Sequence, residues 1–129
     1  MDENITIHQL ANNIINNNDS KITVRKLIVK SWNQSIKNNI TNIVIQNKIE
    51  ETKTIFGELL TNYIANNYNF LGITDDNKLD ISNIIISESY NLWLKNLIHF
   101  NIQNNYLLNE EDVVDEDFPN NKWVELAFN

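Results

Sequence analysis

The stretch IQNKIEETKTIFGELLTNY, residues 45–63, has the most regular apolar pattern in the chain. Spacings of three and four residues place side chains on one face of an α-helix. The apolar side chains that keep this spacing are Ile45, Ile49, Phe56, Leu59, Leu60 and Tyr63. The pattern therefore predicts a central helix over residues 41–66. Gly57 lies inside it and lowers helix stability by up to about 1 kcal/mol relative to alanine, so we interpret it as a point of close crossing.

Two helices are predicted before this stretch. The first begins at Thr6, because TIHQ has the Thr-x-x-Gln form of a capping box. The stretch NNNDS, residues 16–20, then interrupts it. The second runs from residue 22 or 23 to residue 35. Its predicted core face comprises Val24, Leu27, Ile28 and Trp32.

After the central helix, ISNIIISESYNLWLKNLIHF, residues 81–100, is apolar almost all round, which favours a buried helix capped by Asp80 or Ser82. The β-branched residues Ile84–Ile86 leave a short strand as the alternative. KWVELAF, residues 122–128, is either a final strand or a short helix. We therefore expect a mainly α protein, a compact bundle of four to five helices. A short β pair near the C-terminus is an alternative.

The composition limits the class of protein. A chain of 129 residues fits a single domain over 1–129, and its 42% hydrophobic residues suffice for one core. The absence of cysteine excludes disulfides, thiolate catalysis and cysteine-bound zinc. The first residues, MDENITIHQL, are acidic where a signal peptide is basic. No apolar run approaches the roughly 18 residues of a membrane span. We expect a soluble cytoplasmic protein.

The charges are segregated along the chain. Residues 20–49 contain six cations and no acid, whereas Glu110 to Asp117 contain six acids and no cation. The formal net charge is −7, and removing the six acids leaves 11 acids against 10 bases. The acidity is therefore mostly one local feature, the acidic segment NEEDVVDEDF, residues 109–118, which we expect to be exposed. Residues 119–129 are expected to dock on the core.

The acidic segment has three interpretations. It is a solvated loop, a metal site, or a patch that contacts a basic partner. DDNKLDISNIII, residues 75–86, is not a calcium loop, because Leu79, Asp80 and Ile86 occupy ligand or glycine positions. If the acidic segment were helical, four acids would share one face: Glu111, Asp112, Asp115 and Glu116. That face could hold Mg²⁺ together with a diphosphate. We favour the partner-binding patch, and expect no metal or cofactor.

A basic stripe on the second helix competes for the function. Lys26, Lys30 and Lys37 lie opposite its core face and could contact phosphates. However, the chain has a single arginine, Arg25, and its net charge opposes nucleic-acid binding. A third interpretation joins the two patches, with the acidic segment folded back on the basic helix or paired with it in a homodimer.

Enzyme patterns are absent from the sequence. The chain has two glycines, Gly57 and Gly72, which are too few and too far apart for a phosphate-binding glycine loop. There is no GxSxG elbow and no HExxH motif. His8 and His99 have no neighbouring ligand pattern. Glu51-x-Lys53 resembles half of a nuclease site but lies mid-helix. We predict that the protein is not an enzyme.

The favoured function is occlusion of a basic protein partner, such as a nuclease or another toxin, by an immunity protein, an antitoxin or a phage-type inhibitor. The predicted contact residues are Glu110, Glu111, Asp112, Asp115, Glu116 and Asp117, with Trp123 as an apolar anchor. Trp32 and Phe56 are expected in the core instead. The alternatives are a nucleic-acid-associated regulator that uses Lys26, Lys30 and Lys37, and a structural or assembly subunit.

Overall fold

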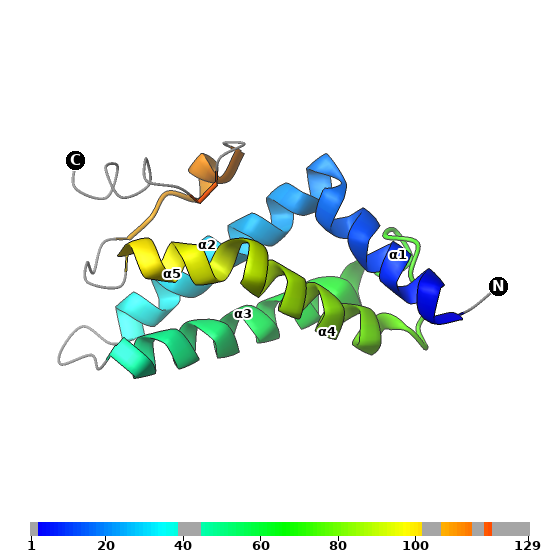
Figure 1. Ribbon diagram of the computed structural model, residues 1–129, viewed down its shortest axis with the longest axis horizontal. Helices are drawn as coiled ribbons and strands as arrows, with labels where there is room; N and C mark the ends of the chain where they lie inside the picture. Colours follow the sequence, from blue (N-terminus) through cyan, green and yellow to red (C-terminus); the bar gives the residue numbers. More distant parts are fainter. Residues whose placement is uncertain (1–2, 39–44, 102–106, 115–117, 120–129) are drawn as a thin grey trace.

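The computed structural model describes residues 3–38, 45–101, 107–114 and 118–119. These residues are mainly helical and contain no strand, which confirms the predicted class (Figure 1). The predicted strand or helix over residues 122–128 lies outside the described residues. The helices surround a single cluster of buried apolar side chains that includes Trp32 and Phe56, as predicted.

Helices α1 (Glu3–Asn16) and α2 (Asn18–Asn38) meet at one residue, Asn17. The side-chain oxygen of Asn17 accepts hydrogen bonds from the backbone N–H groups of Asp19, at 3.0 Å, and Ser20, at 3.4 Å. An asparagine that bonds the first free N–H groups caps a helix N-terminus. The predicted interruption within residues 16–20 is therefore a sharp junction rather than a loop. Figure 1 shows the two helices diverging from this point.

Both N-terminal helices begin earlier than the sequence patterns predict. Thr6 lies inside α1 and does not begin it, because the helix starts at Glu3. Helix α2 starts at Asn18 rather than at residue 22 or 23, and it continues past residue 35 to Asn38. It therefore includes Lys37, so all three lysines of the basic stripe are on one helix.

Helix α3 (Ile45–Asn67) runs back along α2 (Figure 1). Its end lies within one residue of the predicted end, and residues 41–44 are outside the described residues. Phe56, Leu60 and Ile64 are buried on the face that the spacing indicated. At the start of α3, Glu51 accepts a hydrogen bond of 2.8 Å from the side-chain amide of Asn38 at the end of α2.

A turn at Gly72 ends the third helical region. The N–H of Ile73 donates to the carbonyl of Tyr68, and the N–H of Gly72 donates to the carbonyl of Asn69. This pair of bonds is the Schellman arrangement, which needs a left-handed residue at its second-last position. Gly72 supplies it with φ of 77°, a conformation that glycine adopts without a side-chain clash.

Helix α4 (Lys78–Ser89), the π-helical turn η1 (Tyr90–Leu94) and helix α5 (Lys95–Asn101) follow one another without a break (Figure 1). Ile84–Ile86 are helical, so the strand alternative is wrong: burial of Ile85 outweighs the β preference of the three isoleucines. Ser82 lies inside α4, where its hydroxyl donates to the carbonyl of Lys78, so it does not cap the helix.

The expected close crossing at Gly57 is only partly correct. Ile86 of α4 does lie over Gly57, but a Cβ atom built there would be 3.9 Å from the Ile86 Cδ1 atom. That separation is an ordinary van der Waals contact. The packing of α3 against α4 therefore leaves room for an alanine side chain.

Candidate functional site

The acidic segment begins with a short capped helix. Asn109 accepts a hydrogen bond of 3.0 Å from the N–H of Glu111 through its side-chain oxygen, and its carbonyl accepts from the N–H of Asp112. The turn η2 (Glu110–Val114) follows, a 3-10 helix with three acids in its first turn. Negative side chains are favoured at a helix N-terminus because the free N–H groups there are partly positive. The order of residues Asn-Glu-Glu-Asp thus explains why this stretch is helical.

One asparagine joins the start of this segment to α2. The side-chain nitrogen of Asn33 donates to the carbonyl of Leu108 at 2.8 Å, and the Asn33 side-chain oxygen accepts from the Leu108 N–H at 2.8 Å. Both polar groups of the Leu108 backbone are therefore paired by a single side chain. Leu108 itself is buried against the core. The pairing fixes where the chain approaches α2.

The only arginine of the chain fixes the other end of the segment. Arg25 of α2 is 6% exposed, and its guanidinium donates to the carbonyl of Val113 at 3.0 Å. The Arg25 Cζ atom lies 4.9 Å from the ring centre of Trp93 and 5.2 Å from that of Phe118. A guanidinium over an aromatic face is attracted by the ring quadrupole, more strongly away from water. Arg25, on α2, therefore contacts Trp93 of η1 and both Val113 and Phe118 of the acidic segment.

Two ion pairs lie between these fastening points. The Lys26 Nζ atom is 3.7 Å from a Glu111 carboxylate oxygen, and the Lys30 Nζ atom is 3.8 Å from that of Glu110. The side chain of Glu111 remains 75% exposed and that of Lys30 54%. Exposed pairs of this kind contribute about 0–1 kcal/mol. They set the orientation of the carboxylates, while Asn33 and Arg25 hold the segment.

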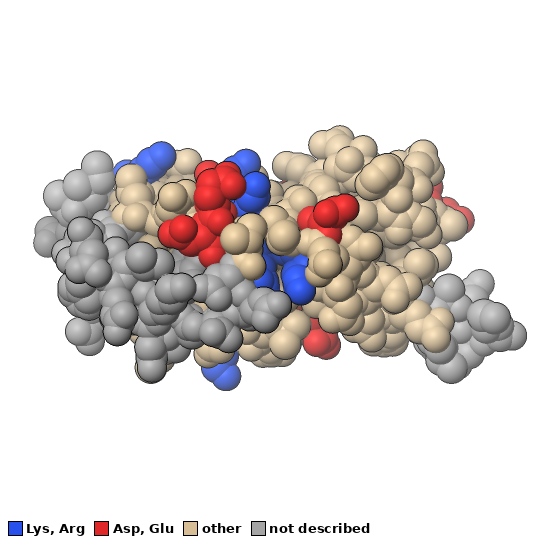
Figure 2. Space-filling model, turned by 90° about the horizontal axis from the view of Figure 1, so that it is seen from above, with Lys and Arg blue, Asp and Glu red and all other residues tan. Residues whose placement is uncertain are grey.

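The predicted contact residues are thus partly brought together. Glu110, Glu111 and Asp112 lie on η2, and Figure 2 shows acidic side chains gathered on this face beside basic ones. The structure confirms the interpretation in which the acidic segment folds back on the basic helix, for Glu110 and Glu111. Three further acids and the predicted anchor lie outside the described residues: Asp115, Glu116, Asp117 and Trp123.

The expectation that the whole acidic segment is exposed is wrong for two residues. Val113 is fully buried and Phe118 is 4% exposed, whereas Val114 is 61% exposed. In the described part of the segment, Val113 and Phe118 enter the core, whereas Glu110, Glu111, Asp112 and Val114 keep contact with solvent. Residues 119–129 were expected to dock on the core. Pro119 is buried, and residues 120–129 lie outside the described residues. Lys37 is exposed near the end of α2.

Arg25 and Asn33 were missed as fastening residues. A signal for Arg25 was present in its spacing, since Val29, Trp32 and Ile36 follow it at helical intervals and all three are buried. An arginine on such a row is expected to point inward and to find acceptors. Asn33 gave no signal, because the chain is rich in asparagine and Asn33 lies among the lysines of the basic stripe.

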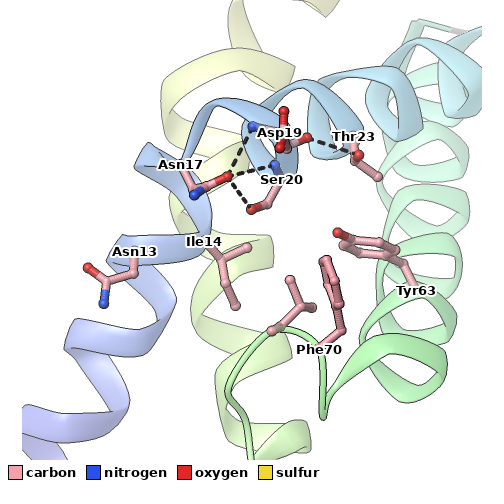
Figure 3. A pocket seen from close by; sticks show the side chains of 9 residues that line it. Asn13, Ile14, Asn17, Asp19, Ser20, Thr23, Tyr63 and Phe70 are labelled. Atoms are coloured by element: carbon pink, nitrogen blue, oxygen red, sulfur yellow. Dashed lines mark hydrogen bonds between the residues drawn. The ribbon is translucent and has the colours of Figure 1, made fainter.

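A second feature is a cavity of about 440 Å³ at the junction of α1 and α2 (Figure 3). Helix α1 contributes Asn13 and Ile14, α3 contributes Tyr63, and the turn after α3 contributes Phe70 and Leu71. The rest of the lining comes from Asn17, Asp19, Ser20 and Thr23. Burial raises the pKa of Tyr63 above its ordinary value, and a hydrogen bond with Thr23 lowers that pKa in part.

Other candidate sites are not assembled in the described residues. In the described part of the chain, no group of three or more His, Asp or Glu side chains is placed to hold a metal ion. His8 on α1 and His99 on α5 are both exposed. None of the described helices combines the length and the apolar character needed to cross a membrane.

The arrangement defines a helical protein with an acidic segment fastened across one of its own helices. No protein-family model, no curated protein and no solved structure matches this chain.

Proposed function

We propose that this is a non-catalytic cytoplasmic protein that occludes a basic protein partner with its acidic segment. The observation that supports the proposal is the attachment of that segment to α2 by Asn33 and Arg25. A loop whose side chains are merely solvated needs no such attachment. Here two polar side chains of the scaffold are committed to holding the residues on either side of Glu110, Glu111 and Asp112.

Attachment improves binding because it removes an entropic cost. A segment that is ordered before it meets its partner loses less conformational freedom on association. Carboxylates on an ordered segment also steer a basic partner in one orientation, which raises the association rate and the specificity. Val114, which is 61% exposed beside these acids, offers apolar surface that a partner would bury.

The two lysines do not cancel the charge of the segment. Lys26 and Lys30 face Glu111 and Glu110, while the sequence places six acids between residues 110 and 117. Because both ion pairs are exposed, a basic partner competes with the lysines at little cost. The same pairs weaken the nucleic-acid alternative, since two of the three lysines of the basic stripe already have acidic neighbours.

The class of partner follows from this charge. We propose a basic protein such as a nuclease or another toxin, bound as an immunity protein, an antitoxin or a phage-type inhibitor binds its target. Asp115, Glu116, Asp117 and Trp123 are proposed to extend the contact. The fold is proposed to be a bundle of four to five helices in all.

The test compares two variants with equal charge. In the first, Glu110→Gln, Glu111→Gln and Asp112→Asn neutralise the described acids of the segment. In the control, Glu58→Gln, Asp76→Asn and Glu88→Gln neutralise three exposed acids on other elements. A partner is captured from cell extract with the unmodified protein and identified, and its association rate with each variant is measured at low and high salt.

We expect the first variant to bind about tenfold more slowly at low salt and the control to bind nearly as fast as the unmodified protein. Equal rates for the two variants would show that the acidic segment does not direct binding. Capture of a duplex rather than a basic protein would favour the nucleic-acid regulator. Capture of a second copy of this chain would favour the homodimer.

A further inference from the structure

We infer that the cavity at the α1–α2 junction is a second contact site, which receives the cationic side chain of an arginine or a lysine from the partner. The inference rests on the proposed function, because it takes the partner to be a basic protein. It adds a specific pocket to a contact that otherwise rests on the acidic segment. The pocket, its charge and its aromatic side chains all point to this ligand.

The charge of the lining favours a cation. Asp19 is the one charged residue of the lining, and no described residue forms an ion pair with it. Helices α1 and α3 both end beside the cavity, and neither has a basic residue in its last turn. The carbonyl end of a helix carries partial negative charge, whereas the partly positive N–H groups at the start of α2 are capped by the side-chain oxygen of Asn17. Within the lining, an anion such as phosphate would meet the Asp19 carboxylate and no basic side chain.

The aromatic side chains suit the same ligand. Phe70 is 90% exposed, more than any other large apolar side chain among the described residues, although it lines the cavity. Figure 3 shows Phe70 and Tyr63 on the same side of the pocket, with Ile14 facing them from α1. A guanidinium or ammonium group is attracted to an aromatic face, and its methylene stem packs on apolar side chains.

The polar side chains of the pocket are already ordered. The side-chain oxygen of Asn17 accepts from the Ser20 hydroxyl at 3.3 Å, and the Thr23 hydroxyl donates to the Asp19 carbonyl at 3.0 Å (Figure 3). These bonds fix the backbone on which the Asp19 side chain is carried. The Asp19 carboxylate itself is exposed and takes no part in them. It is therefore available to a cation that enters from solvent.

The pocket and the acidic segment can meet one partner. Both are built on α2, with Asp19 in its first turn and Lys26 and Lys30 on its middle turns. In Figure 2, acidic side chains are gathered over η2, and acidic atoms also lie near the α1–α2 junction, where Asp19 is the one acid of the pocket lining. Basic side chains lie beside both in that view. A basic surface that spans this face would contact both.

The test uses small cationic probes on the full chain. N-acetylarginine amide, N-acetyllysine amide and N-acetylcitrulline amide are titrated into the ¹⁵N-labelled protein, and backbone amide shifts are followed by NMR. Citrulline has the shape of arginine without its charge. The variants are Asp19→Asn and Phe70→Ala, with Asp76→Asn as the control for the loss of one exposed acid.

We expect arginine and lysine probes to shift the amides of Asn17 to Thr23 and of Phe70 and Leu71, and citrulline to leave them unmoved. Asp19→Asn and Phe70→Ala are each expected to weaken arginine binding by about threefold, as an exposed ion pair or cation–π contact would. Asp76→Asn is expected to leave the affinity unchanged. Equal shifts with citrulline, equal weakening by Asp19→Asn and Asp76→Asn, or no shift at the junction would each overturn the inference.

The two proposals fail separately. If the arginine probe does not bind at the junction but neutralising the acidic segment still slows partner association, only the pocket is lost. If the probe binds as expected but the acidic segment has no effect on association, the pocket stands and the proposed function is wrong.

Discussion

The side-chain amide of Asn33 forms two hydrogen bonds with the backbone of Leu108, which lies 75 residues further along the chain. A primary amide offers a donor and an acceptor side by side, in the same arrangement as a peptide group on the edge of a strand. Asn33 therefore pairs with the chain as a neighbouring strand would, but from a helix. Neither aspartate nor leucine at this position could supply both bonds.

Replacing Asn33 with alanine is expected to lower the free energy of unfolding by about 1–3 kcal/mol, because the N–H and C=O groups of the partly buried Leu108 backbone lose their partner. Urea unfolding measures the loss, and hydrogen exchange of the Leu108 amide reports it locally. Gln34→Ala serves as the control, since Gln34 is exposed and its side chain donates to that of Asn38, not to the Leu108 backbone. An exchange rate at Leu108 that does not change would contradict the assignment.

Replacing Arg25 with methionine is expected to lower the free energy of unfolding by about 2 kcal/mol, since the hydrogen bond to Val113 and the ring contacts are lost together. Lysine at this position keeps the charge but lacks the planar fork, so it should recover less than half of the loss. Urea unfolding of both variants measures the change in the free energy of unfolding. Full recovery by lysine would mean that charge alone holds the segment.

The two glycines should respond to alanine with opposite signs. Gly57→Ala is expected to raise the free energy of unfolding by up to about 1 kcal/mol, because the helix gains propensity and the new Cβ is accommodated. Gly72→Ala is expected to lower it by about 1–2 kcal/mol, because alanine is strained at positive φ. Urea unfolding of both variants is the measurement. A lower free energy of unfolding for Gly57→Ala would show that the packing against Ile86 does not accommodate the new Cβ.

Stability at high pH should depend on Tyr63. Its pKa is raised by burial, so folding favours the neutral phenol. The contribution of this group is fully present below the ordinary tyrosine pKa of about 10 and is lost as the pH rises through the raised value. Tyr63→Phe should therefore flatten the loss of stability above that pH.

Thr23→Val provides the second half of this measurement. It removes the hydrogen bond that lowers the pKa of Tyr63. The pKa should then rise further, which absorbance titration of the four tyrosines detects against the unmodified protein. A fall in the Tyr63 pKa in this variant would contradict the assigned cause.

Local periodicity predicted much of the scaffold. The spacing around Phe56 placed α3 to within one residue at its end, and the apolar rows placed Trp32 and Phe56 in the core. These predictions succeeded because three- and four-residue spacing is a property of one segment. The N-terminus of α1 was misplaced, because the Thr6 pattern also fits the interior of a helix.

The site was less predictable because it depends on long-range contacts. Arg25 and Val113 are 88 residues apart, and such a pair leaves no periodic pattern in either segment. The segregation of charge indicated that residues 20–49 and 110–117 were each unusual. It did not decide whether the two segments contact each other or a partner. The ion pairs of Lys26 and Lys30 show that they contact each other.

The contact between Arg25 and Val113 also orders the events of folding. The guanidinium is placed by the early helices, but its acceptor emerges from the ribosome 88 residues later. Until then Arg25 lacks the contacts with Val113 and Phe118 that it makes in the folded protein. Closure over long sequence separations is slow relative to local helix formation. Docking of the described acidic residues should thus be a distinct late step, so that newly made molecules acquire the surface proposed to meet a partner only at the end of folding.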